Sequence, residues 1–144
     1  MLFRSILADK EIKATRPDAW SVLLDENGNL CEGNGSNIFV VRDERIFTPR
    51  EQYVLPGVSR RTAMELAAQL GLQCEQRDLD VYDALTADEV FLTSTSLCIC
   101  AVRSVNGQAI GDGRVPGPIT RRLTQAYIAH VGTDFVAQYL SRLA

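Results

Sequence analysis

Lysine is nearly missing from this sequence of 144 residues. Of its 15 basic residues only Lys10 and Lys13 are lysines, and His130 is the single histidine. The 18 acidic residues outnumber the basic ones, which gives a formal net charge of −3. The chain therefore lacks the excess of basic side chains that is typical of nucleic-acid binding, and nucleic acid is excluded as a partner.

Long apolar runs and regular cysteine patterns are also missing. No stretch approaches the roughly 18 apolar residues of a membrane-spanning helix, and the first ten residues are too charged for a secretory signal. Cys31, Cys74, Cys98 and Cys100 are irregularly spaced. Cys98 and Cys100 would share one strand face, which leaves a metal or redox site as the alternative to buried thiols. We expect a cytoplasmic protein without a membrane partner or a metal site.

What remains is an ordinary globular composition, with 46% hydrophobic and 23% charged residues. The length fits one domain over residues 1–144, without repeats or a linker. Hydrophobic spacing and turn residues predict one mixed α/β unit. Its expected helices cover residues 2–16, 58–70, 81–85 and 118–131, with a last helix capped by Thr133, and its expected strands cover residues 20–24, 30–32, 36–41, 46–49, 72–74, 88–93 and 98–105.

The junction Leu55–Arg60 is the first candidate functional segment. Gly57 lets the backbone approach a ligand closely, and a helix begins just after it. The free N–H groups of Val58 and Ser59 at this helix N-terminus would form an anion site. The alternative is that Ser59 only caps its own helix.

Two further polar features interrupt apolar strands. Thr93–Ser96 places four consecutive hydroxyl residues at a strand end, where they could bind phosphate or carboxylate oxygens. The alternative is an ordinary turn. Glu32 ends an apolar strand before Gly33–Gly35, and a half-buried carboxylate there needs a cationic or donor partner. An exposed turn acid is the alternative for Glu32.

Together and in this order, these blocks closely resemble the fold-type IV (class IV) pyridoxal-phosphate-dependent aminotransferases. This family includes the branched-chain and D-amino acid aminotransferases and the R-selective amine transaminases. The resemblance covers nearly the whole chain and implies a barrel-like β-sheet core with flanking helices, the large domain of the D-amino acid aminotransferase-like fold. It is carried by Asp25-x-x-Gly28-x-x-x-Glu32-Gly33-x-Gly35-Ser36-Asn37-Ile38-Phe39, Phe47-Thr48-Pro49, Leu55-Pro56-Gly57-Val58-Ser59-Arg60, Ala87–Thr95, Gly111-x-Gly113 and Gly117-Pro118-Ile119-Thr120.

The resemblance implies roles for residues that face the cofactor ring and the substrate. Glu32 matches the carboxylate that pairs with the pyridine nitrogen of pyridoxal 5′-phosphate and keeps it protonated. Leu55 matches the residue that packs on the ring face. Ser96 and Leu97 match positions whose backbone N–H groups face the substrate carboxylate.

The resemblance also implies a phosphate cup. Val58 and Ser59 match the pair at the helix N-terminus, next to Gly57. Thr95 matches the second phosphate hydroxyl. Val58, Ser59 and Thr95 would bind the cofactor phosphate through N–H and O–H groups.

The departure from the family pattern concerns the lysine that holds the cofactor as a Schiff base. In the family this lysine lies some three dozen residues before the Glu32 position, which is farther than the given sequence extends before Glu32, so the resemblance assigns no catalytic residue here. Lys10 and Lys13 match helix-surface positions. The opening helix has no cap before Leu2, and by the resemblance the small N-terminal domain with its phosphate-binding arginine is expected to be missing. We therefore expect a truncated, catalytically incomplete C-terminal domain.

Three functions stay open on the sequence. The complete enzyme would transfer an amino group between an amino acid or amine and a 2-oxo acid. A sibling such as aminodeoxychorismate lyase would use the same cofactor for elimination. A third possibility is a non-catalytic binding or assembly module that holds the cofactor non-covalently or not at all. A homodimer is expected, because a missing neighbouring domain exposes apolar surface.

Overall fold

The computed structural model describes residues 2–142, and its centre is the strand β3 (Ser36–Arg42). On one edge β3 pairs antiparallel first with β2 and then with β4, and on the other edge it pairs with β6. β5 lies parallel to β4, and β7 pairs with β6. The remaining bounds are β1 (Val22–Leu24), β2 (Leu30–Gly33), β4 (Arg45–Thr48), β5 (Cys74–Gln76), β6 (Glu89–Ser94) and β7 (Cys98–Val102).

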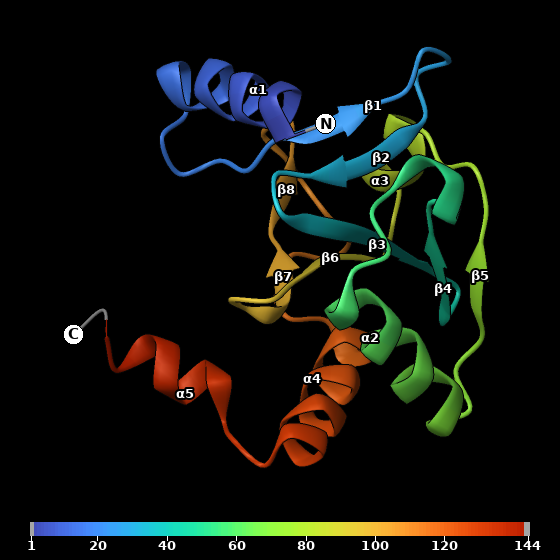
Figure 1. Ribbon diagram of the computed structural model, residues 1–144. Coiled ribbons are helices and arrows are strands. Elements are labelled where there is room, and N and C mark those ends of the chain that lie inside the picture. The colour runs from blue at the N-terminus through green and yellow to red at the C-terminus, as the bar shows by residue number, and fades with distance from the viewer. Residues whose placement is uncertain (1, 143–144) are drawn as a thin grey trace.

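This seven-stranded sheet is open (Figure 1). Within residues 2–142, each of β1, β5 and β7 pairs with one strand only, so the sheet does not close into a barrel. The expected mixed α/β class with flanking helices is confirmed, and the barrel-like closure is not. A separate hairpin of β8 (Ser104–Val105) and β9 (Gln108–Ala109) interrupts the strand expected to run to Val105.

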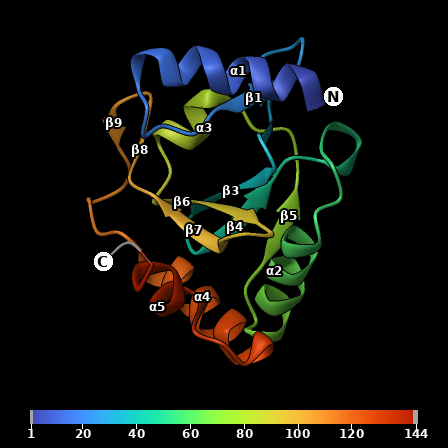
Figure 2. The ribbon, with the colours of Figure 1, turned by 60° about the vertical axis from the view of Figure 1, so that its left-hand side comes forward.

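Helices lie on two sides of the sheet (Figure 2). α2 and α4 contact each other and the strands β6 and β7, while α1 contacts β1 and α3 contacts β8. No helix of the described chain is long and apolar enough to cross a membrane. The helices are α1 (Leu2–Thr15), the 3-10 turn η1 (Glu51–Tyr53), α2 (Val58–Gln69), α3 (Val81–Leu85), α4 (Pro118–Val131) and α5 (Phe135–Leu140).

Alternating side chains of β3 and β6 divide the core into two clusters. Phe39 stacks on Phe91 with ring centroids 4.7 Å apart, and this cluster includes Leu66 of α2 and Leu123 of α4. On the other face, residues of β3 and β6 pack with Leu79 and the α3 region. Because these central strands are buried on both faces, they read as nearly continuous apolar runs.

The ends of the helices follow local chemistry. Gly132 has φ 68° at the end of α4, and Gly71 has φ 72° just after α2, as the sequence predicts. Pro118 begins α4, as expected. The expected cap at Thr133 is wrong, because Asp134 is the N-cap of α5 and its side chain accepts the Ala137 N–H at 2.9 Å. The cap is therefore one residue later, where a carboxylate meets a positive helix end.

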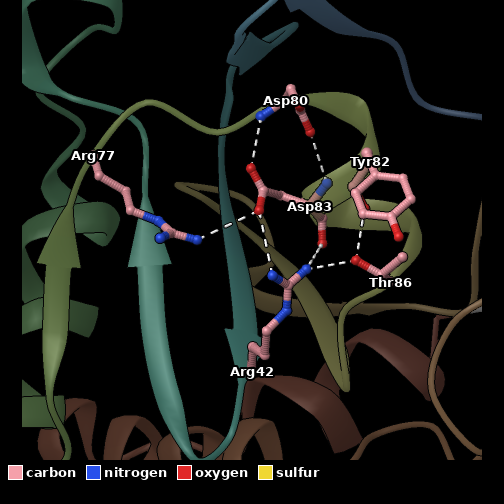
Figure 3. A network of polar contacts seen from close by, with 6 residues as sticks. All are labelled: Arg42, Arg77, Asp80, Tyr82, Asp83 and Thr86. Atoms are coloured by element: carbon pink, nitrogen blue, oxygen red, sulfur yellow. Dashed lines mark hydrogen bonds and ion pairs between the residues drawn. The ribbon is translucent and has the colours of Figure 1, made fainter.

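A network around Asp83 fixes α3 against the sheet (Figure 3). Asp83 and Asp80 form a reciprocal capping box, in which each side chain accepts the backbone N–H of the other. Asp83 Oδ1 also lies 3.5 Å from Arg42 Nη1 and 3.4 Å from Arg77 Nη2. One partly buried carboxylate therefore joins α3 to β3 and to the segment after β5.

Replacing Asp83 by alanine is expected to lower the free energy of unfolding by about 1–2 kcal/mol, since the Asp80 N–H loses its acceptor and two partly exposed ion pairs disappear. Asp78→Ala is the matched control, because Asp78 is half exposed and pairs with half-exposed Arg50. Urea denaturation measures both changes. Equal losses in the two variants would contradict a specific role of the Asp83 network.

All four cysteines are free thiols. Burial raises the pKa of Cys74 from its ordinary value of 9.0 to about 11, and burial also raises the pKa of Cys31, Cys98 and Cys100. Among the described residues, no group of three or more His, Cys, Asp or Glu side chains could hold a metal ion. The thiols are thus protonated and weakly nucleophilic near neutral pH.

These pKa shifts predict alkaline destabilisation. The unfolded chain releases the Cys74 proton near pH 9 and the folded chain only near pH 11, so the stability present below pH 9 declines as the pH rises between these values. Denaturation at pH 8 and pH 10 measures the decline, and Cys74→Ala is expected to reduce it. An unchanged decline in this variant would assign the pH effect to other groups.

Candidate functional site

A row of buried polar side chains crosses three strands at one end of the sheet. Glu32 of β2 is paired with Asn37 of β3, which is paired with Thr93 of β6. Directly paired residues point to the same face of a sheet. Their exposed fractions are 5%, 6% and 1%, and Thr93 Oγ1 has no hydrogen-bond partner among the described residues. The row is a strip of polar groups next to the apolar α2-facing core.

The loop before α2 is held on this row through Leu55. Glu32 Oε2 accepts the Leu55 N–H at 2.7 Å, and Asn37 Nδ2 donates to the Leu55 carbonyl oxygen at 3.1 Å. Leu55 itself remains 57% exposed. Glu32 Oε1 has no donor among the described residues, so one oxygen of a buried carboxylate is left to accept a hydrogen bond from a ligand. The alternative of an exposed turn acid at Glu32 does not hold.

Gly57 lies where the loop approaches Asn37 closely. A Cβ atom at position 57 would overlap Asn37 Oδ1. The sequence predicts close backbone approach at Gly57, and the structure shows that the neighbour is an amide side chain of β3. A larger residue at position 57 would therefore displace either the Asn37 amide or the loop.

The N-terminus of α2 presents unpaired N–H groups beside the loop. Gly57 is the N-cap and provides no side-chain cap, and the first backbone bond of the helix runs from Arg61 to Gly57. The N–H groups of Val58 and Ser59 therefore precede the first intrahelical bond, and the side chain of Val58 is 67% exposed. Ser59 does not cap the helix, because its Oγ donates to the Ser94 carbonyl oxygen at 2.9 Å.

The turn between β6 and β7 is tied to α2 through Ser94. Ser94 Oγ accepts the Leu97 N–H at 3.1 Å and lies 3.3 Å from Ser96 Oγ, while its carbonyl group accepts from Ser59. The side chains of Thr95 and Ser96 are exposed and Leu97 is partly buried. The Leu97 N–H is thus engaged within the turn.

The structure brings most of the expected site residues together. Contacts link Glu32 to Leu55 and link Ser59 to the turn that carries Thr95, Ser96 and Leu97. Asn37 was not among the expected site residues, and Thr93 and Ser94 were expected only as part of the hydroxyl run Thr93–Ser96. A polar residue within an apolar strand was the available signal for Asn37 and Thr93, whereas only the fold shows that Ser94 contacts Ser59.

The two lysines lie on α1. Lys13 Nζ pairs with Asp9 Oδ2 at 2.8 Å across one helical turn, and Lys10 is exposed. No hydrogen bond or ion pair of the described residues joins either lysine to Glu32, Ser59 or the 95–97 turn.

The family model for amino-transferase class IV matches residues 2–105, which includes the polar row, the α2 N-terminus and the β6–β7 turn. The chain belongs to this family. It is 40% identical over 126 residues to branched-chain-amino-acid aminotransferase-like protein 2 of Arabidopsis thaliana, covering 88% of this chain and 22% of that protein.

Solved structures of the same family share the fold. The branched-chain amino acid aminotransferase from Escherichia coli superposes with a TM-score of 0.83 at 37% identity, over 89% of this chain and 43% of that one. The branched-chain amino acid aminotransferase from Thermobaculum terrenum in its pyridoxal-phosphate form gives a TM-score of 0.82 at 34% identity, over 93% and 44%. This class IV aminotransferase domain thus spans less than half the length of these relatives.

Proposed function

We propose that this domain binds pyridoxal 5′-phosphate at the polar row. The observation that carries the proposal is the buried Glu32 carboxylate, which has one oxygen free of protein donors and lies next to the loop that leads into α2. The donor set fits the group. A fixed anion suits a protonated ring nitrogen, and the α2 N-terminus with its unpaired N–H groups suits a phosphate.

Each residue has a distinct task in this proposal. Bound pyridoxal phosphate supplies an electron-withdrawing ring. Glu32 holds a proton at the ring nitrogen, and Leu55 covers the ring with its exposed side chain. The N–H groups of Val58 and Ser59 and the hydroxyl of Thr95 bind the phosphate. Gly57 keeps the loop close to Asn37, so the distance between the ring end and the phosphate end of the site stays constant.

The complete enzyme transfers an amino group between an amino acid and a 2-oxo acid, and branched-chain amino acids are the proposed substrates. The names of the relatives support this class, because they are branched-chain aminotransferases or proteins like them. Ser96 is proposed to direct its N–H to the substrate carboxylate. Leu97 takes this role only after its N–H leaves Ser94 Oγ, which makes Ser96 the stronger candidate.

A homodimer and a cytoplasmic location belong to the same proposal. Large apolar side chains are exposed beside the site at Leu55 and Val58, and on α5 at Val136, Tyr139 and Leu140. Exposed apolar surface of this kind favours association.

The test follows the cofactor on the 144-residue chain itself. Added pyridoxal phosphate is expected to give a saturable visible absorbance change that dialysis removes. Borohydride is expected to trap no stoichiometric adduct at Lys10 or Lys13 in peptide mass spectra, because these side chains have no contact with the polar row and react only as exposed amines. No saturable change would contradict cofactor binding, and a stoichiometric adduct at either lysine would contradict non-covalent binding.

A further inference from the structure

Arg60 is buried in the first turn of α2, although arginine is among the side chains that proteins bury least often. Only 2% of this residue is exposed. A guanidinium group stays charged throughout the pH range of folded proteins, so its burial costs free energy unless partners replace the lost water. The cofactor-binding residues proposed above do not explain why this charge is buried here.

The guanidinium group of Arg60 joins α2 to two other segments. Its Nη2 donates to the Pro49 carbonyl oxygen and to Gln76 Oε1, each at 2.9 Å. Its Nη1 lies 3.4 Å from Glu51 Oε1. Pro49 and Glu51 belong to the segment between β4 and the loop before α2, and Gln76 is the last residue of β5. These contacts fix the first turn of α2 against the segment that leads into it.

The charge of Arg60 is only partly neutralised. The carboxylate that pairs with it among the described residues belongs to Glu51, whose side chain is 63% exposed. Water screens an exposed carboxylate, so Glu51 balances a buried cation incompletely. The charge also acts on β5, where burial raises the pKa of Cys74 and the positive charge of Arg60 opposes that rise. Arg60 therefore makes the surroundings of the first turn more positive.

This positive charge belongs to the end of α2 that is already positive. Arg60 is the third residue of the helix, and a Cβ atom at the N-cap Gly57 would lie 3.5 Å from Arg60 Cβ. Helical side chains tilt toward the N-terminus, and the helix dipole disfavours cations in the first turn. Arg60 and the helix end thus repel each other, whereas both attract an anion at the N–H groups of Val58 and Ser59.

We propose that Arg60 is a positioning residue for the phosphate end of the cofactor site. Its guanidinium group holds the N-terminus of α2 in place, and its buried charge strengthens the attraction of that helix end for a phosphate. The phosphate itself stays at the N–H groups of Val58 and Ser59. This role rests on the proposed function, because it takes the N-terminus of α2 as the phosphate end.

The test compares two ligands that differ only in the phosphate. Pyridoxamine 5′-phosphate and pyridoxamine share the ring, and neither has an aldehyde that could react with Lys10 or Lys13. The ratio of their affinities, measured by calorimetry, reports the contribution of the phosphate. Lysine and methionine are similar in length and differ in charge. Arg60→Met is expected to lower the ratio about tenfold, and Arg60→Lys by no more than about threefold.

Arg61→Met is the matched control, because Arg61 is the next residue of the same helix and its side chain is 72% exposed. Its removal is expected to change the ratio by less than about twofold, since water screens its charge. A purely structural Arg60 would weaken the binding of both ligands equally and leave the ratio unchanged in Arg60→Met. An unchanged ratio, or an equal drop in Arg60→Met and Arg61→Met, would overturn the role of Arg60 and leave the cofactor site standing.

Inorganic phosphate gives a second measurement, through the increase that it causes in the urea midpoint. Glu51→Gln keeps the acceptor for Arg60 and removes the opposing charge, so phosphate is expected to bind this variant about twofold more tightly than the wild type. Glu65→Gln is its control, because Glu65 is exposed on α2 and pairs with exposed Arg61 at 3.9 Å. These two variants decide the question if Arg60→Met does not fold.

The outcomes separate the role of Arg60 from the proposed function. Equal phosphate affinity in Glu51→Gln and Glu65→Gln would overturn the role of Arg60. Phosphate binding that follows the charge of Arg60, in a chain that binds no pyridoxamine 5′-phosphate, would support that role and refute the proposed function. A wild-type chain that binds neither phosphate nor pyridoxamine 5′-phosphate would refute both.

Discussion

Replacing Glu32 by glutamine is expected to weaken the binding of pyridoxal phosphate about 10- to 100-fold. Glutamine keeps an oxygen that can accept the Leu55 N–H, so the loop before α2 stays in place. It removes the negative charge that faces a protonated ring nitrogen. A hydrogen bond to a charged group contributes about 1.5–3 kcal/mol, and each 1.4 kcal/mol is a factor of ten in affinity.

Glu26→Gln is the matched control for this experiment. Glu26 is exposed on the turn between β1 and β2, and its replacement removes the same charge from the chain. Absorbance titration gives the affinities, and urea denaturation shows whether the site is still folded. Equal affinity in Glu32→Gln and Glu26→Gln would mean that the ring nitrogen is not at Glu32. A wild-type chain that binds no cofactor would instead refute the proposed function itself.

The positions of the helices and strands were largely predictable, because each depends on local residues. Apolar periodicity and the breaks at Pro17, Gly71 and Gly132 are properties of short segments. The path of the sheet was not predictable in this way. Along one edge, β3 pairs with β2 near its start and with β4 near its end. Only the pairing of residues far apart in the chain shows that the sheet stays open.

Some residues of the candidate site were likewise predictable from local sequence, and others depend on how the strands pair. Glu32 and Ser59 were visible as polar residues at the ends of apolar elements. Asn37 and Thr93 acquire their role from register, since both belong to the polar row only because β3 pairs with β2 and β6 at these positions. The bond from Leu97 to Ser94 was also hidden, because a run of hydroxyl residues does not show which of them accepts from the turn.

The largest effect on stability is expected at Glu89, which is 7% exposed in β6 and fixes the start of α4. Its two carboxylate oxygens accept the N–H groups of Ile119 and Thr120, each at 2.8 Å. A Cβ atom at Gly117 would overlap this carboxylate, so the helix start is packed directly on it. The charge also faces the positive end of the helix.

Glu89→Ala leaves both N–H groups buried without an acceptor, and each unpaired group costs about 1–3 kcal/mol. We therefore expect the free energy of unfolding to fall by about 3–5 kcal/mol, a large share of the 5–15 kcal/mol of a typical domain. Glu89→Gln, which keeps one acceptor, is expected to lose less than half of that. Glu75→Ala is the control, since Glu75 is half exposed on β5. Urea denaturation measures these losses. Equal losses in Glu89→Ala and Glu75→Ala would mean that the Ile119 and Thr120 N–H groups bind water in the variant and that apolar packing alone holds α4.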